Sequence, residues 1–141
     1  MIYEDVVRAI IVVGNQLLIC KHRNSSYTFL PGGHIKEGES PYRALTRELF
    51  EELGIFVYPK YFQLIATLNN FYQNDGEDIN ELIYLYKLLP FNWNDHQYIR
   101  FKALSFLDDD VEYLLAPINK LHEPYPLLPV SLRSIFELVY S

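Results

Sequence analysis

The side chains best suited to chemistry in this sequence are three glutamates in one short segment, Glu48, Glu51 and Glu52. If the segment is helical, the three carboxylates project within about 100° of arc. Like charges at this spacing repel and destabilise an isolated helix, so either basic side chains or a bound cation must offset them. Carboxylates, carbonyls and water are the ligands that Mg²⁺ and Mn²⁺ prefer. The cluster therefore predicts a divalent-metal site.

The glutamates belong to a longer pattern of fixed spacing from Gly32 to Ile55, GGHIKEGESPYRALTRELFEELGI. The pattern is Gly, five residues, Glu, seven residues, and then Arg-Glu-aliphatic-x-Glu-Glu-x-Gly-aliphatic. From average residue usage, such a match arises by accident in a chain of this length with a probability on the order of one in ten million. The segment is identified as a complete Nudix box, and the chain resembles the Nudix hydrolases, in particular their small bacterial members.

This resemblance implies hydrolysis of a nucleoside diphosphate linked to another group, by attack of water on phosphorus with help from Mg²⁺ or Mn²⁺. It implies that Glu48, Glu51 and Glu52 are metal ligands, together with the carbonyl of Gly32. It also implies that Arg47 holds a glutamate in place, a role that suits a planar donor fork beside carboxylates. The catalytic residues expected on this basis are Glu51, Glu52 and Arg47. The general base stays open, with further candidates outside the box at Glu112, Glu81 and Asp108 to Asp110.

Basic residues close in sequence to the glycine loop are candidates for binding an anionic substrate. Arg8 either faces outward or contacts a phosphate or ribose, and Lys21, His22 and Arg23 form either a solvated loop or a clamp. Further candidates for substrate binding, each of which has packing or a tolerated surface position as its alternative, are Gly33, His34 and Tyr72. Tyr98 and Trp93 are other aromatic residues that could stack on a base.

The elements that must position these residues alternate strands with two helices. Ser40 and Pro41 predict the start of a helix that ends at Gly54, and Leu45, Leu49 and Leu53 form its buried stripe. A second helix is predicted over 129–140, with a turn or short helix over 117–121. Strands are predicted at 6–13, 16–21, 28–30, 55–58, 61–68, 81–89 and 111–116. Asn74 to Gly76 is a turn signal, Pro31 to Gly33 is expected to end a strand, and 90–110 stays unassigned. The pattern predicts one α+β domain over 1–141, an α/β/α sandwich with a mixed sheet between helices.

Composition narrows the class of protein. The 141 residues carry 12 Lys and Arg against 18 Asp and Glu, a net charge of −6. Proteins that coat nucleic acid draw their affinity from clustered Lys and Arg, so we expect a small-molecule nucleotide substrate and no nucleic-acid polymer. No run approaches the roughly 18 apolar residues of a membrane span, and the start of the chain lacks a signal-peptide pattern. A cytoplasmic enzyme is predicted, and its aromatic surface permits a homodimer.

The single cysteine, Cys20, lies in an apolar run, so we expect a buried and inert thiol rather than a disulfide or a nucleophile.

A non-catalytic Nudix-fold module that binds or senses a nucleotide is the alternative to an enzyme, although this chain keeps every carboxylate of the box. The sequence does not select among a nucleoside triphosphate, a nucleotide sugar and a dinucleoside polyphosphate.

Overall fold

The strands of the computed structural model form two sheets, and the model describes residues 1–89, 111–121 and 125–140. A mixed sheet has the strand order β4–β1–β6–β5, in which β1 is parallel to β6 and the other pairs are antiparallel. Its strands are β1 (Ile2–Ile10), β4 (Gly32–His34), β5 (Phe62–Asn74) and β6 (Glu77–Leu88). An antiparallel sheet contains β2 (Val12–Val13), β3 (Gln16–His22) and β7 (Val111–Pro117), with β3 in the middle.

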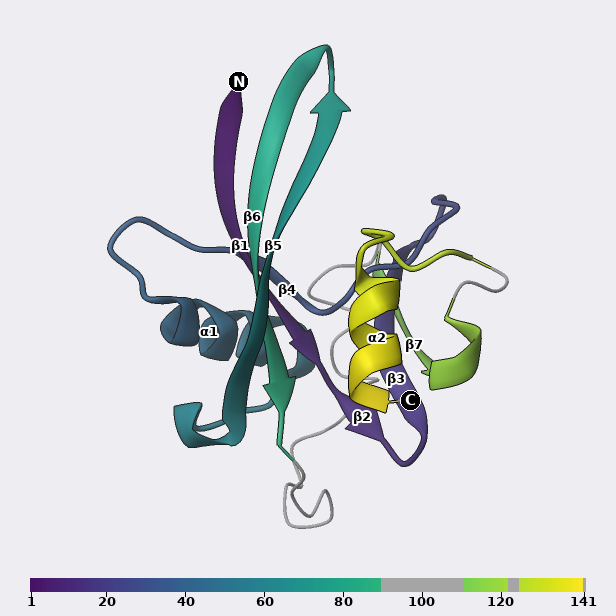
Figure 1. Cartoon of the computed structure of the whole chain (residues 1–141). Helices are drawn as coiled ribbons and strands as arrows, with labels where there is room; N and C mark the ends of the chain where they lie inside the picture. Colours follow the sequence, from purple (N-terminus) through teal and green to yellow (C-terminus); the bar gives the residue numbers. More distant parts are fainter. Residues whose placement is uncertain (90–110, 122–124, 141) are drawn as a thin grey trace.

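The helices α1 (Pro41–Leu53) and α2 (Leu132–Tyr140) lie on opposite sides of these strands (Figure 1). Alternation along β1 explains this arrangement, because successive side chains of a strand point to opposite faces. Val7 and Ala9 pack in the core cluster that contains the leucines of α1, whereas Ile10 packs in the cluster that contains Leu132 and Phe136 of α2. The predicted α+β sandwich, a mixed sheet between two helices, is confirmed.

Local signals at both ends of α1 act as predicted. The Ser40 hydroxyl accepts a hydrogen bond from the Arg43 amide at 3.3 Å, and Pro41 occupies the first turn. Gly54 ends the helix in the left-handed conformation at φ 60°, where a side chain would be strained. The buried stripe consists of Ala44, Leu45, Leu49 and Leu53, so the opposite side of the helix is free to carry charged groups.

The hairpin β5–β6 extends beyond both helices together with the start of β1 (Figure 1). Its turn falls at Asp75 and Gly76, which have φ values of 50° and 78°. Two consecutive positive φ angles are what a tight hairpin turn with the twist of the flanking strands requires. The two strands are longer than the sequence predicted, since they include the polar residues on either side of the turn.

Four predictions about local structure were wrong. Residues 55–58 form no strand, because Ile55 and Val57 insert into the core beside α1 and the following residues form the 3-10 turn η1 (Pro59–Tyr61). Thr28 and Phe29 form only isolated bridges, each with a different neighbour. Gly32 and Gly33 do not end a strand but form β4 against β1. The last helix begins at Leu132 and not at Pro129, since 129–131 form a turn whose Pro129 carbonyl accepts from the Leu132 amide.

The remaining predictions concern the later part of the chain. The 3-10 turn η4 (Ile118–Lys120) lies where a turn or short helix was expected. Trp93, Tyr98 and Asp108 to Asp110 lie outside the described residues. Within the part of the chain that the structure covers, no helix has the length and apolar character needed to cross a membrane.

Leu49 tests the packing of α1 against the mixed sheet. Leu49 is fully buried, whereas the adjacent Phe50 is 58% exposed. Leu49→Ala should lower the free energy of unfolding by about 2–5 kcal/mol, because a cavity forms in the core. Phe50→Ala, as the matched control, should cost less than about 1 kcal/mol. Urea unfolding followed by circular dichroism measures both, and equal losses would contradict the assigned helix orientation.

Candidate active site

A cavity of about 380 Å³ opens where α1, β4, β1 and the antiparallel sheet meet. All three clustered glutamates reach it, and its lining residues are Arg8, Cys20, His22, Phe29, Gly32, Gly33, His34, Glu48, Glu51, Glu52, Val111 and Tyr113. One wall is therefore acidic and comes from α1, and the facing wall is aromatic and comes from β3, β7 and the residues before β4.

The two glycines of β4 allow close contacts with α1 on one side and with β1 on the other. A Cβ on Gly33 would lie 2.6 Å from the carboxyl carbon of Glu48, which is closer than side chains tolerate. A Cβ on Gly32 would overlap the carbonyl oxygen of Val7, and Gly32 has φ 141°. The Gly32 amide donates a hydrogen bond to Oε2 of Glu52 at 3.2 Å. The absence of a side chain at Gly33 thus makes room for the Glu48 carboxylate, and its absence at Gly32 makes room for the backbone of β1.

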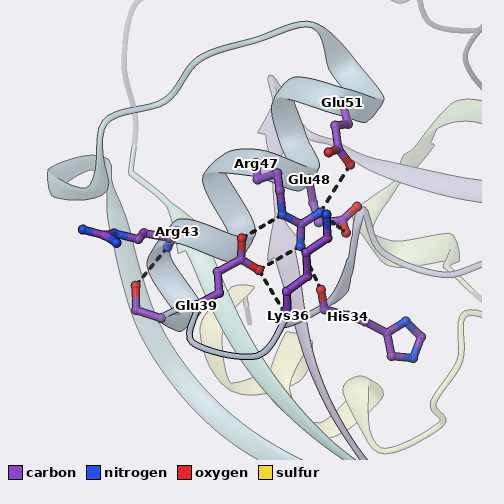
Figure 2. Close-up of polar contacts among 8 residues, drawn as sticks. His34, Lys36, Glu39, Arg43, Arg47, Glu48 and Glu51 are labelled. Carbon is purple, nitrogen blue, oxygen red and sulfur yellow. Dashed lines mark hydrogen bonds and ion pairs between the residues drawn. The ribbon is translucent and has the colours of Figure 1, made fainter.

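Arg47 connects the glutamates of the site to one another (Figure 2). Its guanidinium binds both oxygens of Glu39, with Nε and Nη2 donating at 2.8 and 2.9 Å. Nη1 donates to Glu48 at 2.9 Å and to Glu51 at 3.3 Å. Nη2 also donates to the backbone carbonyl of His34 at 3.0 Å. A planar fork with five donors is suited to such a set of acceptors, so Arg47 fixes the side chains around it.

The pKa values of two paired groups shift in the directions that this geometry requires. Hydrogen bonding from Arg47 lowers the pKa of Glu39 to about 2, although partial burial opposes the shift. The pKa of Arg47 is raised, chiefly by the same hydrogen bond to Glu39 and also by Glu48. Both groups therefore stay charged at neutral pH.

Inside the cavity the carboxylates are less well neutralised. Burial raises the pKa of Glu52, the nearby charge of Glu48 raises it further, and the Arg8 guanidinium opposes the rise. Burial and the charge of Glu52 likewise raise the pKa of Cys20. The Cys20 thiol is therefore protonated and is a poor nucleophile, which agrees with the buried thiol predicted from sequence.

Divalent cations fit this donor set. Glu48 and Glu52 are half-buried carboxylates, and the charge of Glu48 raises the pKa of Glu52, so a cation between them would offset their repulsion. Their hard oxygen atoms match Mg²⁺ and Mn²⁺. Among the described residues, no three acidic, histidine or cysteine side chains already converge on one point. Glu51 also lines the cavity, where its side chain is 52% exposed and accepts a hydrogen bond from Arg47 at 3.3 Å.

Arg8 and the aromatic wall face the glutamates. Arg8 Nη1 donates to the Leu30 carbonyl at 3.1 Å, and its guanidinium lies 5.6 Å from the centre of the Phe29 ring. The His22 ring packs against the same Phe29 ring, with 5.0 Å between the two centroids. Arg8 thus lines the cavity, and its predicted contact with a phosphate or ribose stays a prediction.

The structure does not bring Lys21 and Arg23 to the cavity. Lys21 is only 6% exposed, and its ammonium donates to the carbonyls of His22 and Arg23 and lies over the Tyr125 ring. This basic residue therefore shapes the loop after β3. The Arg23 side chain is exposed and does not line the cavity.

Three further candidates lie away from the box glutamates. Tyr72 does not line the cavity, but its hydroxyl donates to Glu4 at 3.4 Å. Glu112 pairs with Lys21 in the β3–β7 register, whereas its neighbour Tyr113 pairs with Cys20 and lines the cavity. Leu85 of β6 lies opposite Arg8. Glu81 is four residues before Leu85 on the same strand, which places Glu81 about 13 Å from the position of Arg8 along the sheet. These positions favour Glu51 and Glu52 over Glu81 and Glu112 as the general base.

Sequence reasoning missed four residues of the cavity wall, Cys20, Phe29, Val111 and Tyr113. Alternation along β3 would have shown that Cys20 and His22 share a face. The partners of that face lie in β7, at the other end of the chain, and no local signal identifies which strand pairs with β3. His34 lines the cavity and its carbonyl binds Arg47, and its contact with substrate stays a prediction.

Comparison with known proteins gives one family and a set of related chains. A family model described as NUDIX domain matches residues 3–122. The 8-oxo-dGTP diphosphatase of Buchnera aphidicola subsp. Schizaphis graminum (strain Sg) is 31% identical over 129 residues, 86% of this chain and 91% of that protein. The RNA pyrophosphohydrolase of Psychrobacter sp. (strain PRwf-1) is 42% identical over 55 residues, but the match spans only 31% of that protein.

Solved structures share the fold. The crystal structure of a MutT NUDIX hydrolase from Burkholderia pseudomallei has a TM-score of 0.73 and 23% identity, and the match covers 99% of each chain. The MutT protein from Bacillus halodurans also has a TM-score of 0.73, with 20% identity over 98% of this chain and 83% of that one. The two sheets and their flanking helices are therefore a known arrangement.

The ion pair between Glu39 and Arg47 predicts a pH dependence of stability. The pKa of Glu39 is about 2 in the folded protein and about 4.3 in an unfolded chain. Its contribution is thus fully present above about pH 4.3 and is lost as the pH falls through about 2. Glu39→Gln should lower the free energy of unfolding at pH 7, and the gap to the unmodified protein should close between about pH 4 and pH 2.

Urea unfolding at a series of pH values measures this gap. Glu37→Gln serves as the matched control, because Glu37 is an exposed glutamate two residues away and should show no gap at any pH. A gap for Glu39→Gln that stays constant down to pH 2 would contradict the assigned ion pair.

Proposed function

This chain belongs to the NUDIX domain family, and from that premise we propose that it is a divalent-metal-dependent pyrophosphohydrolase. It is a hydrolase of phosphoric anhydride bonds, and the substrate that we propose is a nucleoside diphosphate linked to another moiety. One observation carries this proposal: Glu48 and Glu52 lie half-buried beside two glycines in a cavity that Arg8 also lines. The site therefore combines carboxylate oxygen atoms that can hold a metal ion with the Arg8 guanidinium, which can bind a phosphate.

Nucleoside triphosphates are the first substrates that we propose. The related Buchnera protein, which is similar over most of both chains, is named 8-oxo-dGTP diphosphatase. A nucleoside triphosphate contains the required nucleoside diphosphate, with phosphate as the linked group. Nucleotide sugars and dinucleoside polyphosphates meet the same requirement and stay alternatives. The net charge of −6 disfavours an RNA polymer as substrate.

The metal ligands in this proposal are Glu48, Glu51 and Glu52, with the carbonyl of Gly32, and the ion is Mg²⁺ or Mn²⁺. When bound, such an ion screens the charge of the pyrophosphate and lowers the pKa of a coordinated water. Without that screening, several phosphate charges would repel both a hydroxide and the acidic wall of the cavity.

The side chains of the chain itself supply binding, positioning and proton transfer. Arg8 is placed to bind a phosphate oxygen, because its guanidinium lines the same cavity as the glutamates. Arg47 positions Glu48 and Glu51 through the hydrogen bonds of its Nη1. The water that attacks phosphorus gives its proton to Glu51 or Glu52. Gly33 and His34 form the rim of β4 at which the substrate enters.

A panel of nucleotides with identified products tests the proposed activity. It should contain nucleoside triphosphates, nucleotide sugars, dinucleoside polyphosphates and an RNA oligonucleotide with a 5′-triphosphate. A nucleoside monophosphate should be released from at least one small molecule in the presence of Mg²⁺ or Mn²⁺. Preferential cleavage of the RNA would contradict the substrate class, and binding without turnover across the panel would indicate the sensor module instead.

Glu52→Gln tests the metal site. The substitution removes a charge from a half-buried ligand, so kcat should fall by at least about 100-fold while the fold is kept. Glu37→Gln, on the exposed loop before the helix, should retain full activity. Chelation should abolish the activity of the unmodified protein, and added Mg²⁺ should restore it. An active Glu52→Gln variant, or activity that a chelator leaves unchanged, would contradict the proposed site.

A further inference from the structure

The long strand β5 forms one edge of the mixed sheet. Among the described residues it pairs with β6 alone. A shift in register between Leu64 and Ala66 interrupts this pairing, and the strand is regular over 66–74, which we name the β5 edge segment. Every second residue of an antiparallel edge strand directs its N–H and C=O groups away from the sheet. Those groups of the β5 edge segment have no backbone partner in the described part of the chain.

This edge lacks the features that usually prevent a sheet edge from pairing with another strand. Natural edge strands are often short, charged or interrupted by proline. The other edges of the described sheets have such features: β4 and β2 have three and two residues, and β7 contains Glu112 and Pro117. In contrast, the 13 residues of β5 include no proline and no charged side chain, although 21% of the whole chain is charged. The edge is therefore suited to pairing with a further strand.

The side chains of the β5 edge segment also leave apolar surface in water. Phe71 is 66% exposed and Tyr72 is 38% exposed. The hairpin extends beyond both helices at this level (Figure 1), so neither helix covers these rings. The side-chain hydrogen bonds of the segment run inward to residues of β1 and β6. Its outer edge is thus open to a partner.

Charge indicates which partner fits. The tip of the hairpin carries the exposed acids Asp75, Glu77 and Asp78, whereas its base carries Lys60 and Lys87. If two β5 strands align antiparallel, the acidic tip of each hairpin lies beside the basic base of the other. A parallel alignment would instead bring two acidic tips together. A second copy of this chain, in the antiparallel direction, is therefore complementary to the edge.

We propose that two copies of this chain associate through their β5 edge segments, which join the two mixed sheets into one continuous sheet. Alignment of the segment with itself places the two-fold axis at Asn70. Phe71 of one copy then lies opposite Asn69 of the other, and Tyr72 lies opposite Leu68. Each aromatic ring covers a smaller side chain across the axis, which removes apolar surface from water. A two-fold contact closes on itself, so the assembly is a dimer and not a filament.

The interface is separate from the proposed active site. No residue of β5 lines the cavity that contains the glutamates. The inference therefore goes beyond the proposed function, and its test needs no substrate.

Size-exclusion chromatography with light scattering, over a dilution series, measures the mass of the assembly. One chain has a mass of 16.7 kDa, and the unmodified protein should reach twice that mass. Phe71→Glu should raise the dissociation constant of the dimer by at least about tenfold, because each dimer loses two aromatic contacts and gains two like charges at the interface. The exposure of Phe71 means that the fold of one chain should be kept.

Tyr3→Glu is the matched control. Tyr3 is 75% exposed and lies in the same cross-strand row as Phe71, but it is on β1, with β6 between it and the edge. This substitution should leave the dissociation constant unchanged. Asn69→Glu, at a second exposed position of the β5 edge segment, should weaken the dimer as Phe71→Glu does. Amide hydrogen exchange over 66–74 should be slower in the unmodified protein than in Phe71→Glu, because pairing protects the outward N–H groups.

Three results would overturn the inference. The first is an unmodified protein that stays monomeric at every concentration. The second is a dimer that Phe71→Glu and Asn69→Glu leave unchanged, since that dimer would use another surface. The third is an assembly that grows beyond two copies, which a closed two-fold contact does not allow.

Discussion

Two carboxylates of α1 lie against the two glycines at the start of β4, and the candidate site depends on this contact. Glu48 occupies the space that a Cβ on Gly33 would need, and Glu52 accepts a hydrogen bond from the Gly32 amide. The stripe of leucines on the other side of α1 fixes the helix on the sheet. Hydrophobic packing therefore holds in place an arrangement of charges that electrostatic repulsion alone would separate.

Arg47 supplies part of the opposing charge, but it acts outside the cavity. Its fork binds Glu39 on both oxygens and holds one oxygen each of Glu48 and Glu51. Glu52 stays on the inner side, where burial and Glu48 raise its pKa. The site is thus positioned by an arginine and left short of positive charge at its centre, which is the condition that favours a bound cation.

Short-range signals made most of this region predictable. Ser40, Pro41 and Gly54 determine the ends of α1, and the spacing of its leucines and glutamates determines which side is buried. The facing wall was not predictable, because Tyr113 joins the cavity only through the pairing of β3 with β7, which are about 90 residues apart in sequence. Lys21 shows a second limit: a basic residue near an acidic site was a reasonable candidate for substrate, but strand alternation turns its side chain toward Glu112 and the loop carbonyls.

Hydrolysis in ¹⁸O-labelled water tests the central claim most directly. With Mg²⁺ and a nucleoside triphosphate, the account predicts a nucleoside monophosphate and pyrophosphate, with one ¹⁸O atom in the phosphate group that water attacked, as measured by mass spectrometry. The same mixture with a chelator should give no labelled product. Labelled product at an equal rate after chelation, or the absence of any product with the metal present, would contradict the account.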